Sequence, residues 1–207
     1  MRRRDLCAVP FAVVCVAMLL SQASVASDDL VTIRFYNTFG LSRDVVAGAR
    51  SVAHAVLKTA GIDPRWRECR TSRYEAADRC NNVLSRDELV VRVVRGPVGL
   101  DPSPALGDSF VDTSTGAGVL ATVFADRVLA AGSRTGANPV VLLGRAVAHE
   151  VGHLLIGTPA HSTRGLMRGQ WSDEELRSNR ERDWVFSRSQ ALSMQNRLIT
   201  RARQITR

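Results

Sequence analysis

Three of the four histidines in the sequence are gathered near one another, at positions 149, 153 and 161. The first two flank Glu150 in the run His-Glu-Val-Gly-His. Side chains four residues apart lie on one face of a helix, so His149 and His153 can reach the same metal ion. Imidazole is a normal zinc ligand, and Glu150 lies one step round the helix, where it would face a zinc-bound water. The run therefore indicates metal-assisted hydrolysis, with Glu150 as the general base.

A catalytic zinc ion takes a third protein ligand and keeps one open position. His161 is the first candidate, because Gly157 is expected to end the helix and the three residues after it can return the chain to the metal. Glu174 or Glu175 on the following helix is the rival third ligand. The remaining histidine, His54, lies on an earlier predicted helix and is expected to be an ordinary surface or core residue.

Local signals place the His-Glu-Val-Gly-His run on a buried helix. Asn138 followed by a proline is a good helix start, and the predicted helix runs from Pro139 to about Ile156 with Gly157 as its end. It is apolar on most sides, which predicts burial. Ser172 with Glu175, and Ser187 with Gln190, have the spacing of capping boxes, so helices are expected over about 172–206.

The first part of the chain alternates strands with one helix. Val31, Ile33 and Phe35 alternate with polar residues, which predicts a strand over 30–37 with an exposed polar face. A helix capped by Ser42 and ending at Gly61 follows. Further strands are expected over 62–69, 89–95, 109–112 and 118–124, and a short helix over 125–131. This order predicts an α+β fold.

The region from Asn138 to Trp171 resembles the metzincin metalloproteases, and their matrixin branch most closely. The matching residues are His149, Glu150, Gly152, His153, Gly157, His161, Ser162 and Met167. The resemblance implies a mixed twisted sheet, a buried active-site helix, three histidine ligands, a glutamate base and a methionine turn at Met167 beneath the zinc. The usual motif has glycine three and histidine six residues beyond the second histidine, whereas here the distances are four and eight.

Two functions are consistent with these residues. The first is a secreted zinc endopeptidase that acts on a peptide or protein substrate. Its substrate would add to a cleft-side edge strand over 118–124 by backbone hydrogen bonds. The candidate residues for this role are Gly118, Val119, Leu120, Ala121 and Thr122. The second is a catalytically inactive, zinc-stabilised secreted module that binds envelope polymers or proteins. The intact Glu150 favours the first, since a structural zinc site needs no base.

The N-terminal segment predicts export. Three arginines, an apolar run over 6–20 and small residues at Ser24 and Ala26 are typical of a signal peptide cleaved after Ala26. We therefore expect a secreted or periplasmic protein, with residues 27–207 forming one zinc metalloprotease-like domain and no membrane span after cleavage. The two cysteines that remain, Cys69 and Cys80, are expected to form a disulfide in an oxidising compartment.

The overall composition is that of an ordinary globular protein. The 207 residues are 45% hydrophobic and 23% charged, which argues against disorder or a coiled coil. The net charge is +8, but the arginines are scattered among acidic residues. The excess of basic residues is thus expected to give a solvated surface rather than a nucleic-acid site. We also expect the protein to be a monomer.

Overall fold

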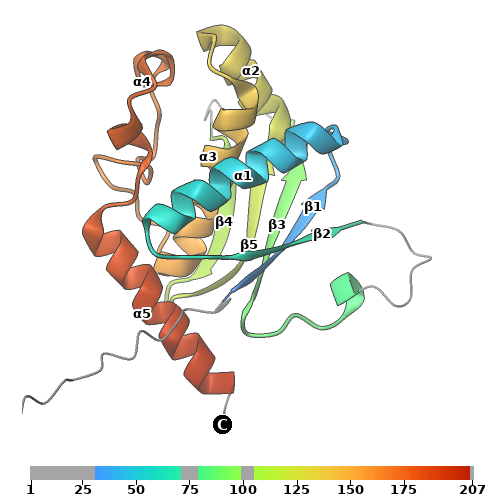
Figure 1. The fold of residues 1–207 in the computed structure, drawn as a ribbon, viewed down its shortest axis with the longest axis vertical. Coiled ribbons are helices and arrows are strands. Elements are labelled where there is room, and N and C mark those ends of the chain that lie inside the picture. Colours follow the sequence, from blue (N-terminus) through green and yellow to red (C-terminus); the bar gives the residue numbers. More distant parts are fainter. Residues whose placement is uncertain (1–30, 71–78, 99–104, 206–207) are drawn as a thin grey trace, which may run out of the picture.

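The computed structural model of the chain describes residues 31–70, 79–98 and 105–205 (Figure 1). The predicted signal peptide lies outside these residues, and so does most of the segment between Cys69 and Cys80. One five-stranded sheet, in the order β2-β1-β3-β5-β4, organises the fold. Its strands are β1 (Thr32–Asn37), β2 (Arg65–Cys69), β3 (Glu88–Val94), β4 (Gly107–Asp112) and β5 (Ala117–Phe124). β4 pairs antiparallel with β5 and all other pairs are parallel, so the predicted mixed sheet and α+β class are confirmed.

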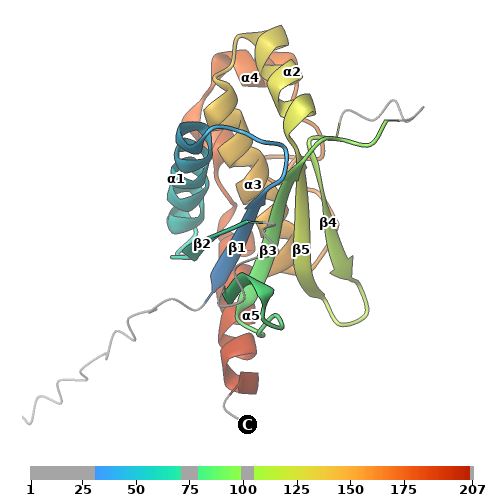
Figure 2. The ribbon, with the colours of Figure 1, turned by 90° about the vertical axis from the view of Figure 1, so that its right-hand side faces the viewer.

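Helices cover one face of this sheet. The described helices are α1 (Arg43–Thr59), α2 (Ala125–Thr135), α3 (Pro139–Ile156), α4 (Asp173–Ser178) and α5 (Arg188–Ile205), and short 3₁₀ turns occur at Arg79–Asn81 and Glu181–Trp184. Of these, α3 packs directly on β3, β4 and β5, and α4 packs on α2. Figure 2 shows α3 behind the strands and α1 to their left, and the two helices pack against each other. The side chains of Ile33, Phe35, Leu89 and Val91 point into this layer and are fully buried.

Helix α3 forms as its end signals predict. The Asn138 side chain accepts hydrogen bonds from the backbone N–H groups of Val140 and Val141, and Gly157 ends the helix at φ 75°. Most of α3 is buried between α1 and strands β3, β4 and β5. Within the described ranges it is the one helix long and apolar enough to cross a membrane, and its place in the core accounts for that apolarity.

The expectation that 118–124 is the edge strand is wrong. This segment is β5, which pairs with β3 on one side and with β4 on the other. The residues predicted to bind substrate, Gly118, Val119, Leu120, Ala121 and Thr122, therefore lie inside the sheet. β4 forms this edge of the sheet instead, next to β5, and β2 forms the opposite edge (Figure 2).

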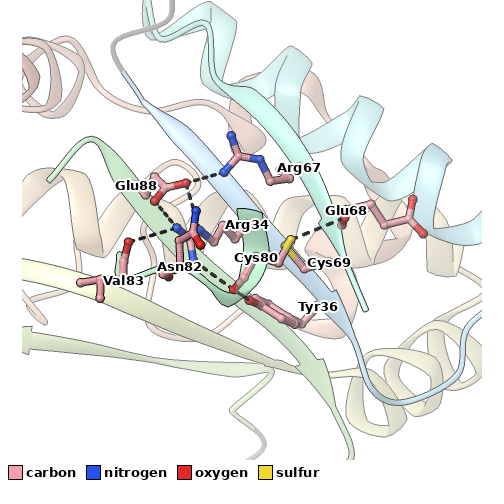
Figure 3. The surroundings of a disulfide bond; sticks show 9 residues. All are labelled: Arg34, Tyr36, Arg67, Glu68, Cys69, Cys80, Asn82, Val83 and Glu88. Atoms are coloured by element: carbon pink, nitrogen blue, oxygen red, sulfur yellow. Dashed lines mark hydrogen bonds and ion pairs between the residues drawn. A yellow bond between two sulfur atoms is a disulfide. The ribbon is translucent and has the colours of Figure 1, made fainter. Parts of the chain in front are cut away.

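The prediction that the polar face of β1 is exposed is wrong. Arg34 on this face is 4% exposed, because the segment after the Cys69–Cys80 disulfide covers it. Its guanidinium donates to the carbonyl oxygens of Cys80 and Asn82 at 3.1 and 2.8 Å, and its Nε donates to Glu88 at 2.9 Å (Figure 3). The predicted disulfide is present, and it fixes the chain whose carbonyls satisfy Arg34.

Glu88 lies at the centre of this buried network. It also accepts from Arg67 at 2.6 Å and from the Ser85 hydroxyl at 3.0 Å. Burial opposes its ionisation, but the hydrogen bonds from Arg34 and Ser85 outweigh this and lower the pKa of Glu88 to about 2 from 4.5. The ionised carboxylate is therefore the form that the fold requires.

Replacing Glu88 by glutamine should lower the free energy of unfolding at pH 7 by about 3–5 kcal/mol, since it leaves a buried guanidinium without its counter-charge. The folded-state pKa is depressed, so this stabilisation is present above about pH 4.5 and is lost as the pH falls towards 2. Urea unfolding curves between pH 7 and pH 2 measure both effects. Wild type and variant should converge at the acidic end, and parallel pH profiles would contradict the assignment.

Candidate metal centre

The imidazole rings of His149 and His153, on α3, and of His161, in the segment after it, converge on one point. The Nε2 atom of His153 lies 3.1 Å from Nε2 of His149 and 3.3 Å from Nε2 of His161. The ligand atoms of all three rings lie within 4.8 Å of one another. Two nitrogens bound at 2.0–2.1 Å to one tetrahedral ion lie about 3.3 Å apart, so this spacing suits a single zinc ion. The triad could hold a metal ion.

Backbone carbonyls fix the tautomers of the two helix histidines. Nδ1 of His149 lies 2.8 Å from the Leu166 carbonyl oxygen, and Nδ1 of His153 lies 2.8 Å from that of Thr158. A carbonyl oxygen only accepts, so both Nδ1 atoms carry the proton and both Nε2 lone pairs face the centre. Facing lone pairs repel one another unless a cation lies between them.

Burial keeps these two rings neutral. Desolvation lowers the pKa of His149 to about 4, and it also lowers the pKa of His153. Only the neutral imidazole offers a lone pair to a metal ion, so the buried position suits metal binding.

The longer turn still returns His161 to the centre. Helix α3 runs one residue further than the usual motif would allow and ends at Gly157, whose positive φ of 75° reverses the chain. The N–H groups of Gly157 and Thr158 both donate to the His153 carbonyl oxygen. Beyond the turn, the Ser162 N–H donates to the Met167 carbonyl oxygen at 2.8 Å, which fixes the residue that follows His161.

Glu174 and Glu175, the alternatives to His161 as third ligand, do not lie with the other two histidines. Glu175 forms the predicted capping box with Ser172 and an ion pair with Arg168 at 3.2 Å. Glu174 is exposed on α4. Neither belongs to the metal-binding group that the described residues form. His54 is also separate, since it lies on α1 beside Trp66 and Asp63.

Met167 and Trp171 pack around the triad. Met167 is 1% exposed, and its Sδ would lie 2.7 Å from a Cβ atom at Gly152, so it contacts α3 between His149 and His153. The Trp171 ring meets His149 edge-on at 5.6 Å, and its Nε1 donates to the Leu166 carbonyl oxygen at 3.2 Å. The same carbonyl thus holds both His149 and Trp171.

Glu150 lies beside the triad and touches the edge strand β4. It is 6% exposed, and its Oε2 accepts a hydrogen bond from the Ser109 hydroxyl at 2.5 Å. Burial raises the pKa of Glu150 to about 7; the hydrogen bond from Ser109 opposes this rise and the nearby Asp108 carboxylate adds to it. A carboxyl group with such a pKa can both take and return a proton near neutral pH.

A cleft of about 500 Å³ opens onto these groups. His149, Glu150 and His161 line it together with Gly107 from β4 and Trp171. Apolar walls come from Leu106, Ala131, Ala146 and Leu176. Two imidazoles of the triad and the Glu150 carboxylate therefore face one opening.

The comparisons with known proteins show the fold. No protein-family model matches the chain, and no curated protein matches it. Among solved structures, the crystal structure of archaemetzincin from Methanopyrus kandleri is similar, with a TM-score of 0.56. The two chains are 15% identical, and the alignment covers 84% of this chain and 99% of the other. This chain shares its fold with that protein.

The sequence predicts the three histidines and Glu150 as site residues, but it does not predict the groups that hold their side chains in place. Ser109, the Thr158 and Leu166 carbonyls and Trp171 all hold these side chains. No spacing rule connects Ser109 with Glu150, which are 41 positions apart and meet only because β4 packs on α3. Trp171, four residues after Met167, was visible in the sequence and was the one available signal.

Proposed function

We propose that this protein is a zinc-dependent endopeptidase of the metzincin type. The observation that carries the proposal is the convergence of three imidazole Nε2 atoms beside a buried carboxylate in one open cleft. The name of the structural neighbour, archaemetzincin, points to the same group of proteins as the sequence resemblance. Assignment to the matrixin branch rests on the sequence resemblance alone.

His149, His153 and His161 would hold the zinc ion. When bound, zinc polarises a carbonyl group and makes a water molecule more acidic. Glu150 would accept a proton from the attacking water at its carboxylate and then deliver it to the leaving amine. The partly apolar cleft would exclude bulk water around the scissile bond, and the Leu166 and Thr158 carbonyls would keep the ligand rings oriented.

The edge strand β4 is the best candidate for substrate pairing. β5 occupies one of its sides, and along the described chain no other strand pairs with its second side. Leu106, just before β4, and Gly107, its first residue, line the cleft with Glu150. An extended peptide added along β4 would therefore pass close to the triad. This role replaces the one expected for 118–122.

Secretion also belongs to the proposal. The signal-peptide pattern, cleavage after Ala26 and a single mature domain over 27–207 are predictions from the sequence. The Cys69–Cys80 disulfide agrees with an oxidising compartment, since such bonds are rare in the cytosol.

Casein and a peptide library, incubated with the purified mature protein, test the proposed activity. We expect cleavage with zinc, loss of cleavage with a chelator, and recovery when zinc is returned. A protein that holds one zinc ion per chain yet cleaves no peptide would overturn the proposal in favour of a zinc-stabilised binding module.

A further inference from the structure

Ser109 makes a short contact with the carboxylate proposed to be the base. Its Oγ lies 2.5 Å from Glu150 Oε2 and 2.9 Å from the backbone carbonyl oxygen of the same residue. Hydrogen bonds from a hydroxyl to an ionised carboxylate have lengths of about 2.5–2.7 Å. Across the described ranges, Ser109 is the donor that the structure shows for this carboxylate. The hydroxyl thus ties Glu150 to strand β4.

Gly107, on the same strand, packs against the other carboxylate oxygen of Glu150. A Cβ atom at Gly107 would lie 2.5 Å from Glu150 Oε1, so the strand passes against this oxygen without room for a side chain. Residues 107 and 109 lie on the same face of β4, because side chains alternate along a strand. β4 therefore contacts both oxygens, one by a hydrogen bond and the other by close packing.

We propose that Ser109 is a positioning residue that holds the Glu150 carboxylate in the orientation needed for proton transfer. This inference rests on the proposed hydrolytic function. A glutamate side chain has three rotatable bonds, and a general base works only within hydrogen-bond reach of the proton it takes. Without the Ser109 hydroxyl, the carboxylate would keep its place in the cleft but lose the contact that selects one orientation.

A double-mutant cycle in the zinc-free protein tests the contact without any activity assay. Urea midpoints are measured for wild type, Ser109→Ala, Glu150→Ala and the double variant, all in the presence of a chelator. We expect Ser109→Ala to lower the midpoint in the wild-type background and to change it much less when Glu150 is already alanine. Equal shifts in both backgrounds would show that the side chains are uncoupled and would overturn the inference.

Steady-state peptide hydrolysis by the zinc-loaded protein tests the role. Ser109→Ala should keep one zinc ion per chain and a KM near wild type, while kcat falls by about tenfold, which corresponds to 1.36 kcal/mol in the barrier. Ser109→Thr keeps a hydroxyl and suits a strand, so it should restore kcat. A merely structural role would not separate kcat from KM or be rescued in this way.

The two experiments, the double-mutant cycle and the kinetics, distinguish failure of this inference from failure of the proposed function. An active wild type whose kcat is unchanged in Ser109→Ala would overturn the positioning role and leave the peptidase assignment intact. An inactive zinc-loaded wild type would refute the peptidase assignment and, with it, the role in catalysis, while the cycle would still decide whether Ser109 holds Glu150.

Discussion

Glu150→Gln should retain one zinc ion per chain and a near wild-type unfolding curve, yet lose about 10²–10⁴-fold in peptide turnover. The amide has nearly the shape of the carboxylate, and its oxygen still accepts the hydrogen bond from Ser109. It cannot take a proton from water, however. Metal analysis, urea unfolding and kcat measured on the same preparation separate these effects.

Glu174→Gln is the matched control for this experiment. Glu174 is a carboxylate of the same length on the neighbouring helix α4, and it is exposed outside the cleft. Its replacement should leave turnover unchanged. Undiminished turnover in Glu150→Gln would remove Glu150 as the base and would require another proton acceptor in the cleft.

Single replacement of His149, His153 or His161 by alanine should abolish stoichiometric zinc binding. Each variant leaves two imidazoles for an ion that needs at least three protein ligands in a catalytic site. Zinc should raise the unfolding temperature of the wild type by mass action and have little effect on these variants. Metal analysis after dialysis and thermal unfolding with and without zinc give the two readouts.

His54→Ala provides the control, because His54 is the remaining histidine and lies on α1 beside Trp66, away from the triad. It should bind zinc as the wild type does. Glu175→Gln should also keep its zinc, since Glu175 is engaged with Ser172 and Arg168. Full zinc content in His161→Ala combined with loss in Glu175→Gln would instead assign the third ligand to the carboxylate.

The sequence alone determined the features that depend on residues close together in the chain. Asn138 and Gly157 delimit α3 because capping and a left-handed glycine act within one turn of a helix. The four-residue spacing brings His149 and His153 onto one face for the same local reason. The capping boxes at Ser172 and Ser187 likewise formed where predicted.

The tertiary structure alone decided which strand is the edge, what covers Arg34 and what holds Glu150. The sequence predicts strands over 109–112 and 118–124, but which of the two pairs with β3 depends on long-range contacts. Arg34 alternates with apolar residues as an exposed side chain would, and it is buried because a disulfide-fixed segment supplies carbonyl partners. Ser109 meets Glu150 only through the packing of β4 on α3. Contacts between distant segments follow from packing of the whole chain, and no local spacing encodes them.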